Sequence, residues 1–234
     1  MILAAGRGTR LGELGRQRPK VLLEIAGQPL LDRHIQDLAR AGAAAVVVNA
    51  HHLADQITAH VENGTWPMPV TVVVEPELLG TAGGVRNALP LLGDGPIVVI
   101  YGDVISDVDL PALVEAHVGS GADATLVVHP ADDAHGKGIV LVDAEDRITG
   151  FAEKPAPEDL ARVPRPFLIN SGIYVVDAAL VRGFTPPSGE CDFGHEVFPA
   201  ALAGGRHLRV QRIGIAVTDI GTPEALAAAQ GGGR

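Results

Sequence analysis

Residues 70–101 read VTVVVEPELLGTAGGVRNALPLLGDGPIVVIY, a segment in which two apolar runs flank a stretch of helical character. Val70–Val74 and Ile97–Tyr101 are short and rich in β-branched residues, which is typical of strands buried on both faces. Thr81–Leu92 lies between them, contains alanine and leucine, and is predicted to be a helix. A strand, a helix and a second strand in this order predict a parallel pair of strands joined by a crossover helix.

The same alternation continues on both sides of this segment. Further strands are predicted at Ile2–Ala4, Val46–Asn49 and Ala124–Val128, and further helices at Leu30–Ala41, Leu53–Glu62 and Leu110–Val118. This order predicts an α/β fold with a doubly wound, mostly parallel, Rossmann-like sheet. In such sheets, ligands bind at the carboxyl ends of the strands.

The pattern changes after about residue 135. Gly138–Val142, Ile148–Phe151 and Phe167–Val175 follow one another closely, with polar turns between them, which favours a small antiparallel portion. The proline-rich segment Ala156–Arg165 is expected to be an exposed loop. The remaining predicted elements are a helix near Phe193–Ala203, a strand near Leu208–Gln211 and a closing helix at Thr222–Gln230 with Thr222 as its N-cap. No linker separates two domains, so we expect one domain.

The composition narrows the classes of function. The net charge of −10 argues against general nucleic-acid binding, which requires a basic surface. No apolar run approaches the ~18 residues of a membrane-spanning helix. The single cysteine, Cys191, cannot form an internal disulfide, which fits a reducing compartment. We therefore expect a soluble, cytoplasmic protein without nucleic-acid or membrane partners, and a homo-oligomer remains open.

Two glycines follow the first predicted strand at its carboxyl end. Gly6 and Gly8 allow the backbone to approach a phosphate and to direct N–H groups at it. The third glycine of a dinucleotide fingerprint is missing, which disfavours an NAD-dependent dehydrogenase, and no P-loop lysine follows. Arg10 and Lys20 lie in the same part of the chain, and two cations near a phosphate-binding loop suit a triphosphate.

Two aspartates follow apolar runs. Asp103 comes directly after Ile97–Gly102, and Asp219 follows Ile213–Val217 just before the closing helix. A carboxylate at the carboxyl end of a strand is positioned to contact a ligand. The alternative is that both aspartates only cap a loop and a helix, as Asp109 is expected to do for the helix that follows it.

The other candidate ligands show no comparable pattern. The nine histidines lack the spacing of a zinc site, so His51, His52 and His195 are expected to have structural or surface roles. Cys191 has no indicated base partner and is expected to be inert.

Six segments in chain order resemble those of the sugar-1-phosphate nucleotidylyltransferases. They are Leu3–Leu11 with Pro19-Lys20, Leu79–Gly83, Gly102-Asp103, Glu153–Pro155, Asn170–Tyr174 and Asp219–Pro223. Glu75–Gly84, Asp192–Glu196 and Asp219–Glu224 are most similar to guanylyltransferases for mannose 1-phosphate and D-glycero-α-D-manno-heptose 1-phosphate. The first predicted strand is shorter than is usual in that family, which leaves open a start upstream of Met1.

The resemblance implies that a sugar 1-phosphate attacks a nucleoside triphosphate and releases pyrophosphate. It implies that Asp103 and Asp219 bind Mg2+ and that Arg10 and Lys20 are the catalytic cations. The implied nucleotide-binding residues are Leu3, Ala5, Gly6, Gly8, Thr9, Glu75, Gly80, Thr81 and Gly102. The implied sugar-phosphate-binding residues are Gly138, Glu153, Lys154, Asn170 and Gly172. Residues 1–135 would then mainly bind the nucleotide, and residues 136–234 the sugar phosphate.

GTP and a mannose- or heptose-type sugar 1-phosphate are the expected substrates. A uridylyl- or cytidylyltransferase of the same fold, such as one acting on N-acetylmuramate 1-phosphate, is the enzymatic alternative. A nucleotide-sugar-binding regulatory protein is the non-enzymatic alternative, although a catalytically inactive homologue has no reason to keep the predicted cations and aspartates. We expect Asp103→Asn and Asp219→Asn each to nearly abolish turnover, because the charge that holds Mg2+ is removed. Because clustered carboxylates repel each other without a metal, we expect the melting temperature of both variants to be unchanged or raised.

Overall fold

The computed structural model describes residues 1–134, 137–153, 160, 163–184, 189–214 and 217–231. Within these residues a nine-stranded sheet forms the centre of the molecule. Its strands are β1 (Ile2–Leu3), β4 (Val46–Ala50), β5 (Val70–Val74), β6 (Pro96–Tyr101), β8 (Ala124–Ala131), β9 (Gly138–Val142), β10 (Ile148–Glu153), β11 (Phe167–Asp177) and β12 (Leu208–Arg212).

The sheet is mixed, as the sequence predicts. Its main path is β10-β9-β11-β6-β1-β4-β5, and β8 joins β11 to β12 beside this path. β1 is parallel to β4 and β6, β4 is parallel to β5, and β8 is parallel to β12. β11 is antiparallel to β6, β8 and β9, and β9 is antiparallel to β10. The predicted parallel N-terminal part and the antiparallel portion after residue 135 are therefore confirmed.

Helices and short turns connect the strands. The helices are α1 (Glu13–Gln17), α2 (Leu30–Arg40), α3 (Ala54–Asn63), α4 (Gly80–Leu92), α5 (Leu110–Ser120), α7 (Ala178–Gly183), α8 (Phe198–Ala203) and α9 (Pro223–Gly231). Two 3-10 turns lie at Thr9–Leu11 and Lys20–Leu22, and a π-helical turn at Phe193–Val197 precedes α8. Two small ribbons complete the fold, formed by β2 (Glu24–Ile25) with β3 (Gln28–Pro29) and by β7 (Val104–Ile105) with β13 (Thr218–Asp219).

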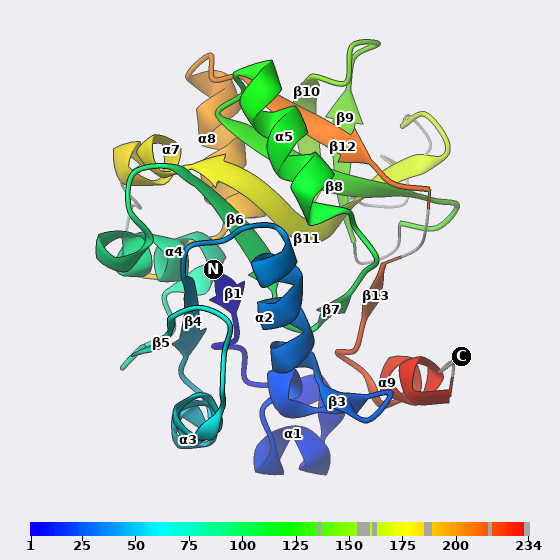
Figure 1. Cartoon of the computed structure of the whole chain (residues 1–234). Coiled ribbons are helices and arrows are strands. Elements are labelled where there is room, and N and C mark those ends of the chain that lie inside the picture. Colours follow the sequence, from blue (N-terminus) through cyan, green and yellow to red (C-terminus); the bar gives the residue numbers. More distant parts are fainter. Residues whose placement is uncertain (135–136, 154–159, 161–162, 185–188, 215–216, 232–234) are drawn as a thin grey trace.

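Helices cover both faces of the sheet, as a doubly wound fold requires (Figure 1). The apolar sides of α4, α7 and α8 pack into one core, and those of α2, α3 and α5 pack into another. Successive residues of β6 face opposite cores, with Val99 in the first and Ile100 in the second. The β-branched residues that predicted this strand therefore fill both cores. No helix of the described residues is long and apolar enough to cross a membrane.

Some details differ from the prediction. Val70–Val74 is not buried on both faces, because β5 lies at the edge of the sheet, where β4 is its only partner among the described residues, and Val74 is 53% exposed. Most of the predicted loop 156–165 lies outside the described residues. The predicted N-caps are confirmed, since Asp109 Oδ1 accepts from Ala112 N at 3.0 Å and Thr222 Oγ1 accepts from Ala225 N at 3.3 Å. The β7–β13 ribbon was not predicted, and it shapes the candidate site.

Candidate active site

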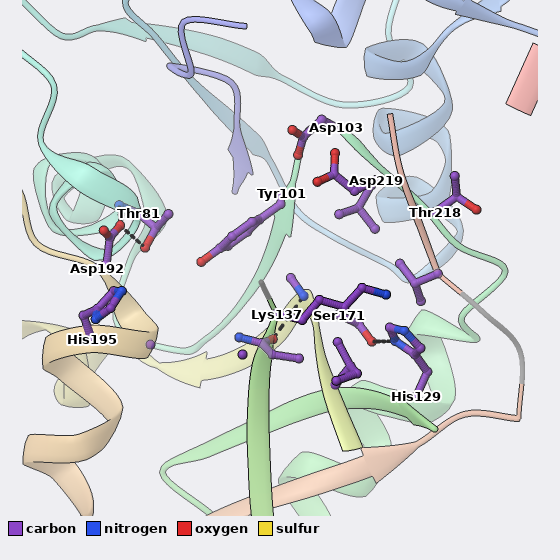
Figure 2. A pocket seen from close by; sticks show the side chains of 17 residues that line it. Thr81, Tyr101, Asp103, His129, Lys137, Ser171, Asp192, His195, Thr218 and Asp219 are labelled. Carbon is purple, nitrogen blue, oxygen red and sulfur yellow. Dashed lines mark hydrogen bonds between the residues drawn. The ribbon is translucent and has the colours of Figure 1, made fainter. Parts of the chain in front are cut away.

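The β7–β13 ribbon brings Asp103 and Asp219 together from distant parts of the chain. Asp219 pairs with Val104 across the ribbon, and Ile220 N donates to the carbonyl oxygen of Asp103 at 3.0 Å. Position 102 requires glycine, because a Cβ there would lie 2.7 Å from the carbonyl oxygen of Leu3. The two carboxylates lie on the same wall of one cavity (Figure 2). The predicted acidic pair is thus a spatial pair.

Each of these carboxylates contacts a cation of the chain. Lys20 Nζ donates to Asp103 Oδ2 at 2.5 Å, and both side chains are largely buried. Arg10 Nη2 donates to Asp219 Oδ2 at 3.3 Å, and Gly221 N donates to Asp219 Oδ1 at 2.6 Å. Each negative charge is therefore compensated by a neighbouring cation, whereas the expectation of mutual repulsion took the two carboxylates as unpaired. The forecast of an unchanged or raised melting temperature for Asp103→Asn loses its basis.

The donor set suits Mg2+ better than a metal held by protein alone. Among the described residues, no group of three or more histidine, cysteine, aspartate or glutamate side chains could hold a metal ion. Asp103 and Asp219 offer two carboxylates that face an open cavity. Mg2+ accepts such a site because it keeps waters and takes further oxygen ligands from substrate phosphates.

Two adjoining cavities are lined by Asp103, and the larger of them is also lined by Asp219. The smaller has a volume of about 280 Å3 and the larger about 650 Å3, and Thr81, Tyr101, Asp103 and Asp192 line both. Of the predicted nucleotide-binding residues, the smaller cavity is lined by Leu3, Ala5, Gly6, Glu75, Gly80 and Thr81, and also by the predicted catalytic Lys20. Of the predicted sugar-phosphate-binding residues, the larger is lined by Gly138, Asn170 and Gly172. Apart from Thr81, which lines both, the predicted residues that line a cavity therefore separate into two cavities, and Asp103 is one of the four residues that these cavities share.

The other predicted residues occupy different places. Gly8, Thr9, Arg10 and Gly102 line neither cavity; Gly8 and Thr9 belong to the turn that presents Arg10 to Asp219. The backbone of Glu153 forms the end of β10, where it pairs with Gly138 at the start of β9. Lys154 lies outside the described residues.

Glu75 holds the floor of the smaller cavity. It is only 2% exposed, and its two carboxylate oxygens accept from Asn49 Nδ2 at 2.8 Å and from Leu79 N at 3.3 Å. Asn49 Oδ1 in turn accepts from Ala4 N at 2.8 Å. These contacts tie β1, β4 and the segment before α4 together, so Glu75 positions the cavity wall. Asn49 was missed, although a polar residue at the end of a valine run was a usable signal.

The start of α4 is occupied by a distant part of the chain. Thr81 donates from both N and Oγ1 to Asp192 Oδ1 at 2.8 Å, and Cys191 O accepts from Ala82 N at 2.9 Å. A Cβ at Gly80 would lie 2.5 Å from the carbonyl oxygen of Cys191. The small residues at the start of α4 leave room for the 191–192 segment. The backbone N–H groups of Thr81 and Ala82 are therefore already hydrogen-bonded to this segment. Burial raises the pKa of the Cys191 thiol, which agrees with the inert role expected for it.

A bulge in β11 forms the floor of the larger cavity. The pairing of β11 with β8 shifts register between Asn170 and Tyr174, and Gly172 there has a φ of 69°. A Cβ at Gly172 would lie 2.9 Å from the ring of Tyr101, so both the backbone and the space favour glycine. Asn170 Oδ1 accepts from Gly172 N at 3.1 Å, and Asn170 Nδ2 donates to Tyr174 Oη at 2.8 Å. The predicted Asn170 and Gly172 thus hold the shape of the bulge.

Several residues of the larger cavity were not predicted to bind a substrate or a metal. They are Tyr101, His129, Lys137, Ser171, Asp192, His195 and Thr218. Figure 2 shows Thr81, Asp192 and His195 at the left, Asp103 and Asp219 at the upper right, and Lys137, Ser171 and His129 below these two aspartates. His195 is exposed, as the expected surface role requires, and it also lines the cavity. Ser171, Asp192 and His195 belong to segments that resemble the family, whereas His129 and Lys137 lie outside those segments.

The His129 ring is hydrogen-bonded through Nδ1 to Ser171 Oγ at 2.9 Å, and both residues are buried. Burial, and to a lesser extent the positive charge of Lys137, lower the pKa of His129. The imidazole is therefore mainly neutral at pH 7, and the positive charge on this side of the larger cavity is that of Lys137.

Comparisons with known proteins identify a family for this chain. The family model described as nucleotidyl transferase matches residues 1–232. A mannose-1-phosphate guanylyltransferase of Mycobacterium tuberculosis is 34% identical over 206 residues, which cover 88% of this chain and 55% of that protein. An N-acetylmuramate α-1-phosphate uridylyltransferase of Neisseria meningitidis is 38% identical over 160 residues, covering 63% of this chain and 66% of that one. The chain spans about half the length of several relatives that it matches.

A solved structure is similar over nearly its full length. The crystal structure of HddC from Yersinia pseudotuberculosis complexed with GMP-PN superposes with a TM-score of 0.79 at 25% identity. The match covers 98% of this chain and 96% of that one.

Proposed function

The chain belongs to the nucleotidyl transferase family, and on that premise we propose that it transfers a nucleoside monophosphate from a nucleoside triphosphate to a sugar 1-phosphate. Pyrophosphate is the second product. The observation that carries the proposal is the meeting of two cavities at Asp103, with Lys20 and Asp219 beside it. Two anionic substrates placed in these cavities would bring their phosphates together at that point.

Different residues bind the two substrates. The nucleotide occupies the smaller cavity, with its phosphates near Gly6 and Lys20. Arg10 lies outside that cavity but contacts Asp219, from which it can reach the leaving pyrophosphate. The sugar phosphate occupies the larger cavity along Gly138 and the β11 bulge, where Glu153 would bind sugar hydroxyls and Lys154 the phosphate. Residues 1–135 thus mainly serve the nucleotide, and residues 136–234 mainly the sugar phosphate, within one domain.

The reaction needs no general base from the protein. An oxygen of the sugar phosphate is already ionised at neutral pH, and it attacks the α-phosphorus in line with the leaving pyrophosphate. Catalysis then consists of positioning the two anions and neutralising their charges. Asp103 and Asp219 would hold Mg2+, which when bound supplies part of that neutralisation. Lys20 and Arg10 exchange their carboxylate partners for phosphate oxygens when the triphosphate enters.

GTP is the favoured nucleotide, with a mannose- or heptose-type sugar 1-phosphate as the acceptor. The similarity to the mycobacterial guanylyltransferase and to a structure crystallised with GMP-PN supports this choice. The similarity to the Neisseria uridylyltransferase favours UTP as the alternative. The family and the absence of a long apolar helix among the described residues are consistent with a cytoplasmic location.

A matrix of triphosphates and sugar 1-phosphates tests the proposal, with pyrophosphate release as the readout. We expect GTP with a manno-configured 1-phosphate to give the highest kcat/KM. A clear preference for UTP would promote the uridylyltransferase alternative. Nucleotide-sugar binding without turnover of any pair would favour the regulatory protein.

A further inference from the structure

Lysine is rare in this chain, and its distribution is uneven. Of the 18 lysine and arginine residues only three are lysines, namely Lys20, Lys137 and Lys154. Lys20 contacts Asp103, and Lys154 belongs to the predicted sugar-phosphate motif. Exposed ion pairs use arginine instead, as in Arg16 with Glu13 and Arg182 with Asp94. Two of the three lysines thus have predicted roles at the site, and the third lines its larger cavity.

The fold fixes where Lys137 stands. Lys137 N donates to the carbonyl oxygen of Ala134 at 3.0 Å, and the next residue, Gly138, begins β9. Gly138 pairs with Glu153 on β10, so Lys137 lies close to the strand end that leads into Lys154. β9 also pairs with β11 next to the bulge, through Ile139 and Ile169. Lys137 therefore lies where the ends of β9 and β10 meet the floor of the larger cavity.

The charges around Lys137 leave its ammonium available. Three aspartates line the same cavity, but Asp103 contacts Lys20, Asp219 contacts Arg10, and Asp192 accepts from Thr81. Among the described residues, no carboxylate forms an ion pair with Lys137. Its neighbours His129 and Ser171 are hydrogen-bonded to each other, and Figure 2 shows all three on one side of the cavity. The larger cavity thus carries one lysine without a carboxylate partner in the described part of the chain.

We propose that Lys137 is a phosphate-binding residue for the acceptor substrate, in addition to Lys154. Its Nζ binds the phosphate of the sugar 1-phosphate, and the His129–Ser171 pair maintains the wall beside it. This inference rests on the proposed function and deepens it. A sugar 1-phosphate has to approach a chain of net charge −10 and a cavity lined by three aspartates, so one lysine would have to offset considerable repulsion. An ammonium is a compact charge with three donors, which suits a phosphate that approaches from an open cavity.

The test compares Lys137→Met, Lys137→Arg and a control, Arg182→Met. Arg182 is on α7, lines neither cavity, and its loss changes the net charge by the same amount. Titration calorimetry measures the affinity for mannose 1-phosphate and for the triphosphate, and steady-state assays give the KM of each. For Lys137→Met we expect an affinity for the sugar 1-phosphate about tenfold or more below the wild type, the loss typical of a hydrogen bond to a charged group. Nucleotide affinity should not change, Lys137→Arg should lose less, and Arg182→Met should match the wild type.

The outcomes separate the inference from the function on which it rests. If the wild type turns over a sugar 1-phosphate and Lys137→Met binds it within about twofold of the wild type, the role of Lys137 is wrong while the function stands. If Lys137→Met lowers nucleotide affinity and melting temperature as much as sugar-phosphate affinity, Lys137 is structural and the inference is also wrong. If the wild type binds and converts no sugar 1-phosphate, the proposed function fails first, and the inference fails with it.

Discussion

Replacing Asp103 by asparagine removes the negative charge that faces the Lys20 ammonium. Lys20 Nζ and Asp103 Oδ2 are 2.5 Å apart, and the two side chains are 15% and 23% exposed. Removing one partner of a fully buried ion pair costs about 3–5 kcal/mol, whereas an exposed pair contributes about 0–1 kcal/mol. Some solvent contact remains here, and the asparagine oxygen can still accept a hydrogen bond. We therefore expect the free energy of unfolding to fall by about 1–2 kcal/mol.

This loss is measurable as a shift in melting temperature. In a chain of 234 residues each kcal/mol corresponds to roughly 2–4 °C, so Asp103→Asn should unfold roughly 2–8 °C below the wild type. Circular dichroism with EDTA present follows the transition without bound metal. Asp219→Asn is the matched control, because the Arg10–Asp219 pair is 60% and 50% exposed and its loss should cost less than about 1 kcal/mol.

A double-mutant cycle isolates the pair itself. Lys20→Met, Asp103→Asn and the double variant should show a coupling free energy of about 1 kcal/mol or more. If Asp103→Asn melts at or above the wild-type temperature, repulsion from Asp219 outweighs the attraction of Lys20. That result, or additive single effects, would refute the argument from the ion pair.

Two further predictions concern the sugar side. Lys154→Ala should raise the sugar-phosphate KM and lower kcat while calorimetry shows nucleotide affinity nearly unchanged; an unchanged sugar-phosphate dependence would remove Lys154 from the site. Gly172→Ala should lower the melting temperature by roughly 4 °C or more, because a φ of 69° and a Cβ 2.9 Å from the Tyr101 ring cost about 2 kcal/mol together. Gly183→Ala, with nothing within 4 Å of its Cβ, is the control, and equal melting of the two variants would contradict the argument.

Local patterns were enough to predict most of the regular elements. The valine and isoleucine runs at Val46, Val70 and Ile97 each begin within a residue of an observed strand. Apolar residues of β6 fill two cores, which is why that strand was recognisable. An apolar run does not show whether its strand lies inside the sheet or at the edge. Val70–Val74 resembles an inner strand but lies at the edge, because no further strand pairs with it among the described residues.

The site was harder to predict because its key contacts join distant residues. β7 and β13 are two residues long each, too short for any periodicity, yet their pairing brings Asp103 to Asp219. The 191–192 segment reaches the start of α4 across more than a hundred positions, and nothing in either segment indicates the other. Lys20 was predicted as a catalytic cation, but its contact with Asp103 followed only from the fold.

Pyrophosphate release, measured with both substrates and with the two aspartates altered, tests the central claim most directly. We expect the wild type to release pyrophosphate from a triphosphate only when a sugar 1-phosphate and Mg2+ are both present. Asp103→Asn and Asp219→Asn should each lower that rate by roughly a thousandfold, because several kcal/mol of charge stabilisation at the transferring phosphate are lost. Release that does not depend on a sugar 1-phosphate, or near wild-type rates in either variant at limiting Mg2+, would contradict a nucleotidyl transfer centred on these two aspartates.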